Sequence, residues 1–264
     1  MKKSVIVVLL LTIIFCVQSC MKDSSKIDSF VLRYRVLDTI SLKQVDDRTL
    51  RIGISYQKNA RGFVKSYSYD EKDEKRFFDS LAQKHLDIGF KSTITTNKYY
   101  AHAKLVQDMF ACDFLSIDVS CTQNYNTTHP SSKNLNDIVR YLSTTCYPFI
   151  RERYPKVYLS DIEKQTSELA KQYIGLGLVF HTPHSYDFFK KNMTPYSPID
   201  KMVNNLTKND LILVGNTISL SGVFPGLGFL YFTELPDVPG EYDITVKMEG
   251  DDGKIYSATT KMKF

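Results

Sequence analysis

Residues 235–264, LPDVPGEYDITVKMEGDDGKIYSATTKMKF, contain the clearest fold signal in this chain of 264 residues. Hydrophobic and polar side chains alternate on both sides of a turn at residues 250–253, as they do in two antiparallel strands with one buried face. One stripe comprises Tyr242, Ile244, Val246 and Met248, and the other comprises Tyr256, Ala258, Thr260, Met262 and Phe264. The stretch predicts a C-terminal β-hairpin, in which EGDDGK forms the turn because it lacks the ligand spacing of a calcium loop.

The PGEY sequence at residues 239–242, ahead of a hairpin that closes the sequence, resembles the last two strands of immunoglobulin-like sandwiches in bacterial surface proteins. The resemblance covers about thirty residues. It implies a β-sandwich and carries no information about a ligand.

Alternating patterns predict further strands upstream. The chain contains 17 Tyr and 16 Phe, residues that favour strands, and no Trp. The expected strands are residues 30–37, 50–56, 63–69, 114–121, 174–181, 211–220 and 229–235. The first three are expected to form a meander with one solvated face.

Helical spacing of hydrophobic residues occurs between these strands. It predicts helices at residues 160–173 and 134–150, and a weaker one at 71–84. The expected fold is therefore mainly β (α+β), a β-sandwich-like globule with two or three helices and immunoglobulin-like C-terminal strands. Residues 28–264 are predicted to form one domain, with a split near 153–156 as the alternative.

The N-terminus has the features of a secretory signal. Lys2 and Lys3 precede an apolar run at residues 5–17, which is too short to span a bilayer. The following residues, Val17-Gln18-Ser19-Cys20, resemble the bacterial lipobox, although Gln18 replaces the usual small residue, as Bacteroidota lipoproteins tolerate. We expect a signal peptide at 1–19, a lipidated Cys20 and a flexible tether at 20–27. The alternative is an ordinary signal peptide cut nearby.

A second resemblance lies in the segment FLSIDVSCTQNYNTTHPSSKNLNDIVRYL. A strand, an HP turn and an LND sequence that opens a helix are similar to a pattern in a Bacteroidota lipoprotein family with no assigned activity. The pattern consists of Ile117, Val119, Tyr125, Asn126, His129, Pro130, Leu135, Asn136 and Asp137. It implies no catalytic residues. Two triplets, Asp38-Thr39-Ile40 and Asp79-Ser80-Leu81, also match the form of O-glycosylation acceptors in that phylum.

The overall charge gives no sign of an electrostatic partner. The formal net charge of the whole chain is +5. Without residues 1–19, which contain two lysines and no acid, the chain has 32 basic and 29 acidic residues. Nucleic-acid-binding domains usually show a basic stripe and a pI above about 9, whereas the sequence pI is 8.7. We therefore expect no nucleic-acid partner.

The strongest catalytic candidate is HTPHSYD, in which His181, His184 and Asp187 could ligate zinc in an envelope hydrolase. Its histidines lie three apart around Pro183, unlike the helical zinc motif with a spacing of four. The favoured interpretation is a strand that ends in a polar loop. The sequence contains no GxSxG nucleophile elbow, and the paired carboxylates Asp251 and Asp252 fall in a predicted turn. We assign no catalytic, cofactor or metal residues.

Three cysteines follow Cys20, namely Cys112, Cys121 and Cys146. We interpret Cys121 and Cys146 as buried and unpaired, on a strand face and a helix face, with a Cys121–Cys146 disulfide as the alternative. Exposed aromatic residues could stack on sugars or peptides, and the candidates are Tyr99, Tyr100 and Tyr186.

These patterns predict a non-enzymatic binding or assembly protein, lipid-anchored at the outer membrane on either its periplasmic or its surface side. A protein or a glycan is the expected ligand. The alternatives are the metal-dependent hydrolase described above and an adhesin or pilus-like subunit, which would form polymers.

Labelling cells with an alkyne fatty acid tests the lipid anchor. The wild-type chain is expected to incorporate the label, because the acyl chains are attached at Cys20, and the Cys20→Ala variant is expected to remain unlabelled. Equal labelling of both chains would contradict lipidation at this residue.

Overall fold

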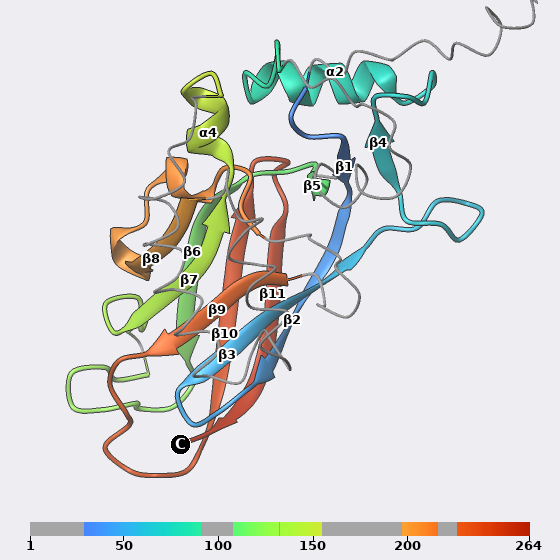
Figure 1. Cartoon of the computed structure of the whole chain (residues 1–264). Helices are drawn as coiled ribbons and strands as arrows, with labels where there is room; N and C mark the ends of the chain where they lie inside the picture. Colours follow the sequence, from blue (N-terminus) through green and yellow to red (C-terminus); the bar gives the residue numbers. More distant parts are fainter. Residues whose placement is uncertain (1–28, 91–107, 132, 155–196, 216–225) are drawn as a thin grey trace, which may run out of the picture.

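Two β-sheets packed face to face form the body of the protein in the computed structural model, which describes residues 29–90, 108–131, 133–154, 197–215 and 226–264 (Figure 1). The larger sheet has the strand order β2-β3-β9-β7-β8. Its strands are β2 (Leu37–Gln44), β3 (Thr49–Tyr56), β7 (Val139–Thr145), β8 (Ser197–Met202) and β9 (Gly226–Phe232). The second sheet has the order β11-β10-β6 and comprises β6 (Phe114–Cys121), β10 (Glu241–Gly250) and β11 (Ile255–Lys263).

The C-terminal hairpin is confirmed in its register and in its buried face. Tyr242 of β10 faces Met262 of β11, and Met248 faces Tyr256 at the turn end. All four of these side chains are buried. β6 adds to the free edge of β10 in antiparallel fashion, so a strand from the middle of the chain completes this sheet.

One hydrophobic core fills the space between the two sheets. It combines Leu50 and Ile52 of β3 with Ile244 and Val246 of β10 and Val119 of β6, all fully buried. An aromatic cluster closes the end of this core where the chain terminates, and it comprises Tyr125, Phe232, Tyr242 and Phe264. This shared core makes the architecture a β-sandwich, as the sequence predicted.

A smaller layer covers the opposite end of the sandwich (Figure 1). It contains a three-stranded sheet of order β4-β1-β5 and two helices. The elements are β1 (Arg33–Arg35), β4 (Ser66–Ser68), β5 (Asp108–Phe110), α2 (Lys75–Lys84) and α4 (Tyr147–Arg151). Two 3₁₀ turns, η1 (Val203–Asn205) and η2 (Lys208–Leu211), follow β8.

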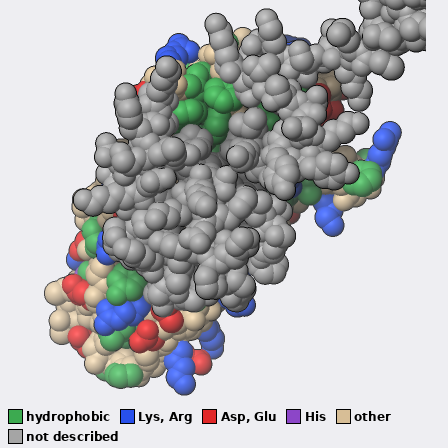
Figure 2. All heavy atoms as spheres, in the orientation of Figure 1, with side chains coloured by type: hydrophobic (Ala, Val, Ile, Leu, Met, Phe, Trp, Pro, Cys, Tyr) green, Lys and Arg blue, Asp and Glu red, His purple; other side chains and the backbone are tan. Residues whose placement is uncertain are grey.

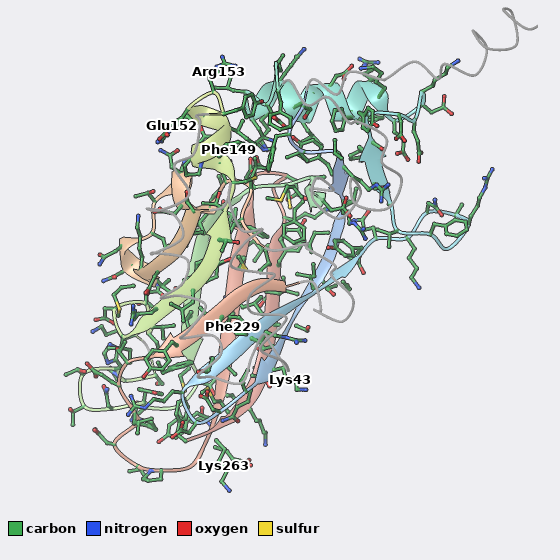
Figure 3. The ribbon with its side chains drawn as sticks, viewed as in Figure 1. Lys43, Phe149, Glu152, Arg153, Phe229 and Lys263 are labelled. Atoms are coloured by element: carbon green, nitrogen blue, oxygen red, sulfur yellow. The ribbon has the colours of Figure 1, made fainter. Side chains whose placement is uncertain are left out.

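A second hydrophobic core lies beneath α2 and α4. Phe78 and Ala82 of α2 meet Tyr34 of β1 and Ile150 of α4 in it. Phe149 on α4 lies toward α2 (Figure 3), where its ring contacts Phe30 in an edge-to-face arrangement with centroids 5.1 Å apart. The helical layer is therefore fixed to the sandwich by its own core.

The helix predicted at 134–150 is wrong over most of its length. Residues 139–145 form β7, which lies between β8 and β9, and a helix begins only at Tyr147. Val139, Tyr141, Leu142, Ser143, Thr144 and Thr145 are all buried, so both faces of the strand are covered. A strand buried on both faces carries no period-two pattern, and its hydrophobic positions resemble helical spacing.

Three smaller differences concern strand limits. The strand predicted at 30–37 divides at Val36 between β1 and β2, and only residues 66–68 of the segment 63–69 are strand, paired with β1 rather than in a meander. Of the strand predicted at 211–220, residues 211–215 form the end of η2 and a single bridge at Val214, and residues 216–220 lie outside the described residues. The helix at 71–84 is confirmed as α2, and the elements predicted at 160–173 and 174–181 lie outside the described residues.

No helix in the described part of the chain is both long and apolar enough to cross a membrane. The split near 153–156 falls at the limit of a described segment, so the single-domain assignment stays a prediction.

Gly228 offers a test of how tightly the larger sheet is packed. Its φ is +123°, and a Cβ atom would lie 2.4 Å from the carbonyl oxygen of Leu142 on β7. We expect Gly228→Ala to lower the free energy of unfolding by about 3 kcal/mol, because backbone strain and a backbone clash add. Urea unfolding measures the loss, and Gly62→Ala is the control. Gly62 also has a left-handed φ of +81°, but a Cβ atom there would meet no other atom, so the substitution is expected to lower the free energy of unfolding by about 1 kcal/mol. Equal losses would contradict this packing.

Candidate functional site

A pocket lies between α2 and the turn that joins β10 to β11. Its volume is about 340 Å³, which is at the lower end of the range for small-molecule sites. The lining residues come from the β1–β2 junction, the ends of β3 and β4, α2, the β5–β6 link and the hairpin turn. They are Val36, Leu37, Gln57, Lys65, Tyr67, Phe77, Ser80, Leu81, Ala111, Cys112, Asp252, Lys254 and Tyr256.

Two stacked rings form one side of the pocket. Tyr67 of β4 and Phe77 of α2 lie with ring centroids 5.1 Å apart and planes 25° apart. Phe77 is 56% exposed, although it is a large hydrophobic residue on a helix. Lys65 and Lys254 are exposed cations in the same lining, where Asp252 is the only acid. The lining therefore combines an aromatic face with a small excess of positive charge.

A chain of hydrogen bonds forms the pocket wall behind the rings. The Tyr256 hydroxyl donates to Asp252 Oδ2 at 2.9 Å, and the Cys112 thiol lies 3.7 Å from the same hydroxyl oxygen. Burial raises the pKa of Cys112 to about 12, against the opposing effect of the Tyr256 hydrogen bond. Burial also raises the pKa of Tyr256. Both groups are thus protonated near neutral pH, which leaves neither activated as a nucleophile.

Below this wall, a buried carboxylate holds α2 in place. Asp113 Oδ2 accepts hydrogen bonds from Lys84 Nζ at 2.8 Å and from His85 Nε2 at 2.9 Å, both at the end of α2. Its other oxygen, Oδ1, accepts from the backbone N–H of Leu213 at 3.1 Å. Lys84 also pairs with Asp251 in the hairpin turn. We call Lys84, His85, Asp113 and Asp251 the clasp.

The charges of the clasp stabilise one another. Burial alone would favour the neutral acid, but the hydrogen bonds and charges of His85 and Lys84 hold the pKa of Asp113 at about 2. Burial favours the neutral amine of Lys84, yet its bonds to Asp113 and Asp251 raise its pKa. An ionised Asp113 can only accept hydrogen bonds, so His85 carries its proton on Nε2. Its Nδ1 lies 3.2 Å from the buried hydroxyl of Tyr34.

A second buried carboxylate fixes the beginning of the described chain. Asp87 is 1% exposed and accepts from the backbone N–H groups of Phe30 and Val31, each at 2.8 Å. Ser29 Oγ and the Tyr154 hydroxyl donate to the same carboxylate at 2.5 and 2.6 Å. The segment that leads into β1 is therefore held against the end of α2.

The motif at 117–137 comprises the end of β6 and the hydrogen-bonded loop that follows it. Asn126 Oδ1 accepts from the backbone N–H of His129 at 2.8 Å, and His129 Nε2 lies 2.7 Å from Asp137 Oδ1. Asn136 accepts from the Val119 backbone at 2.8 Å and donates to Asp118 at 3.0 Å, so it tethers the loop to β6. The LND residues lead into strand β7 instead of opening a helix.

All three described cysteines are free and buried. The prediction of unpaired thiols is confirmed, and the alternative Cys121–Cys146 bridge is wrong, because Cys121 lies in the sandwich core and Cys146 in the core beneath α2. Cys146 begins α4 after β7 rather than lying on a helix face.

Several predicted site residues lie outside the described residues. They are Cys20, the zinc candidates His181, His184 and Asp187, and the aromatic candidates Tyr99, Tyr100 and Tyr186. The described segments contain no group of three or more His, Cys, Asp or Glu placed to hold a metal ion. The two hydroxyl residues of the O-glycosylation triplets are both described. Thr39 lies on β2, where its hydroxyl is hydrogen-bonded to that of Ser55 at 2.7 Å, and Ser80 is exposed in the pocket lining.

Sequence reasoning missed the pocket and the clasp. It placed Asp251 and Asp252 in a turn, which is correct, but gave them no partner. The available signal was weak: charged residues cluster at the end of a helix and in a hairpin turn, and nothing in the sequence links the two. Comparison with known proteins adds no further signal, since no family model, curated protein or solved structure matches the chain.

The ionised state of Asp113 predicts a pH-dependent contribution to stability. Because its folded pKa of about 2 lies below the usual value of 3.8, the contribution is complete above about pH 5 and disappears as the pH falls through 2. We expect Asp113→Asn to lower the free energy of unfolding by about 2 kcal/mol at pH 7, and by much less at pH 2.5.

Urea unfolding at both pH values measures this difference. Asp79→Asn is the control, because Asp79 pairs with Lys75 on the exposed side of α2 and should contribute less than about 0.5 kcal/mol. The same loss for Asp113→Asn at pH 7 and pH 2.5 would show that its charge is not the stabilising feature.

Proposed function

We propose that this protein is a lipid-anchored, non-enzymatic binding protein of the cell envelope, attached to the outer membrane through Cys20. The observation that carries the binding role is the pocket beneath α2. Its aromatic and cationic groups are suited to recognition, whereas its thiol and phenol are held protonated. A site with this lining binds a ligand without attacking it.

The lining favours an acidic glycan. The stacked pair Tyr67–Phe77 offers an apolar ring face to the C–H groups of a sugar, and Gln57 and Ser80 offer hydrogen-bonding groups to its hydroxyls. Lys65 can pair with a carboxylate or phosphate group, and Lys254, whose Nζ lies 3.4 Å from Asp252 Oδ2, can add a second contact. The volume suits a small ligand or one end of a longer chain.

The clasp supports this role by holding the pocket open. Lys84 at the end of α2 bonds both Asp113 and Asp251, so the helix is fixed above the hairpin turn. A pocket held by ionised groups in both the free and the bound state requires little reorganisation when a ligand enters.

Arrays of acidic glycans, neutral glycans and peptides, probed with the purified chain, test this proposal. We expect binding to acidic glycans, and at least a tenfold loss of affinity in a Phe77→Ala, Lys254→Ala double variant, because it removes the ring face and one cation. Phe63→Ala is the control: it removes a phenylalanine that is 68% exposed, against 56% for Phe77, and that does not line the pocket.

Three results would contradict the proposal. They are acidic-glycan binding that survives the double variant, a preference for peptides, and stoichiometric zinc that disappears in a His181→Ala, His184→Ala variant. The last result would favour the metal-dependent hydrolase.

A further inference from the structure

The connection between β3 and β4 projects from the body of the protein as a narrow loop (Figure 1). We call residues 58–64 the finger. A bridge between Lys58 and Val64 closes its base, and the backbone N–H of Asn59 donates to the carbonyl oxygen of Phe63 at 2.7 Å. The two sides of the finger are thus held together by backbone hydrogen bonding.

One side chain organises the tip. Asn59 Oδ1 accepts from the backbone N–H groups of Arg61 and Phe63 at 3.0 and 3.1 Å. Gly62 takes a left-handed φ of +81° and donates its N–H to the Asn59 carbonyl oxygen at 2.9 Å. These bonds satisfy the backbone within the loop and fix the direction of the residues on either side of Gly62.

The finger presents hydrophobic side chains to solvent. Phe63 is 68% exposed and Val64 is 38% exposed. A turn can be built from polar residues without loss of its hydrogen bonds, so the geometry of the loop does not require these side chains. Phe63 and Val64 are neighbours on a preformed projecting loop, and together they form a hydrophobic patch of the kind that marks an interaction surface.

The surrounding charge indicates what that surface is. Residues 48–69 contain five basic residues and no acidic one. Lys58 and Arg61 on the finger form no ion pair with any acid in the described part of the chain. The space-filling view shows hydrophobic and basic side chains side by side on this projection (Figure 2). A loop that carries both hydrophobic side chains and cations suits an anionic lipid surface, where rings enter the acyl boundary and cations meet headgroups.

The finger lies at the end of the molecule where the described chain begins. β4 follows the finger and pairs with β1, and the segment just before β1 is held by Asp87. Cys20 stands nine positions before Ser29, a distance that an extended chain spans in about 30 Å. A lipid on Cys20 would therefore bring this end of the protein to the bilayer.

We propose that the finger is a second membrane contact, which inserts Phe63 and Val64 into a bilayer of anionic lipids while Lys58 and Arg61 bind the headgroups. The orientation rests on the lipid attachment in the proposed function, but the contact itself rests on the finger alone. Two cations near an anionic surface strengthen membrane association by roughly thirtyfold. Insertion would hold the body in one orientation on the membrane.

A tryptophan reporter tests the contact, because the chain contains no Trp. The full chain with Phe63→Trp is reconstituted into vesicles of phosphatidylglycerol or phosphatidylcholine that carry brominated acyl chains. We expect blue-shifted emission and at least twofold quenching in phosphatidylglycerol only. Val238→Trp is the control, since Val238 is 67% exposed and lies at the opposite end of β10 from the clasp, so it should remain unquenched.

A charge reversal in the reporter chain completes the test. Lys58→Glu with Arg61→Glu is expected to abolish the quenching, and neither residue is buried, so the variant should keep the melting temperature of the parent. Equal quenching in both lipids, or equal quenching of both reporters, would overturn the proposal. A blue shift that requires envelope proteins instead of lipid would assign the finger to a protein partner. Fatty-acid labelling of the same preparations reports Cys20 separately, so failures of the anchor and of the finger give different results.

Discussion

The carboxylate of Asp113 is the interaction on which the arrangement of the helical layer depends. A buried charge is tolerated only when its hydrogen bonds are satisfied, and Asp113 satisfies them with groups from α2 and from the segment after η2. Its backbone exchanges hydrogen bonds with Asp251 in the hairpin turn, through Asp113 N–H to Asp251 Oδ1 at 3.1 Å and Asp251 N–H to Asp113 O at 2.9 Å. Loss of this carboxylate would leave His85 without its acceptor and Lys84 paired only with Asp251.

The same constraint explains why a pocket exists beside the clasp. The clasp bonds only the end of α2 to the hairpin turn, while Phe77 near the beginning of the helix remains 56% exposed. The space between that ring and the hairpin turn is bordered by Cys112 and Tyr256. The thiol and the hydroxyl of these two residues contact each other at 3.7 Å. The pocket thus follows from the place at which the helix is fixed and from the polar wall that it faces.

The elements that the sequence predicted well are those whose signal is local. The C-terminal hairpin alternates strictly over both strands, because one face of β10 and β11 is solvated and the other lies on the core. β6 matched its predicted limits for the same reason. β7 did not, since burial of both its faces removed the alternation.

The pocket and the clasp could not be predicted, because their residues are far apart in the sequence. Lys84 and Asp251 are neighbours only after β6 has paired with β10 and brought Asp113 beside the turn. A sequence pattern reports periodicity within an element, whereas a site between elements depends on topology. The finger was not predicted for a different reason. In the sequence, Phe63 continues the alternation of Lys65 and Tyr67, but in the structure the strand β4 begins only at Ser66.

The distribution of exposed hydrophobic residues ties the pocket to the proposed membrane contact. Large exposed hydrophobics in the described chain number eight, and only Leu235 and Val238 lie toward the end where the chain terminates. The other six belong to the finger, α2, the residues just after α2, and the start of β11, and they are Phe63, Val64, Phe77, Leu86, Ile88 and Ile255. Hydrophobic residues scattered singly need no explanation, but a concentration at one end does. On the proposed anchoring, this end faces the bilayer, and the pocket would then open close to the headgroups. A ligand for this site would therefore be one that is presented at the membrane surface.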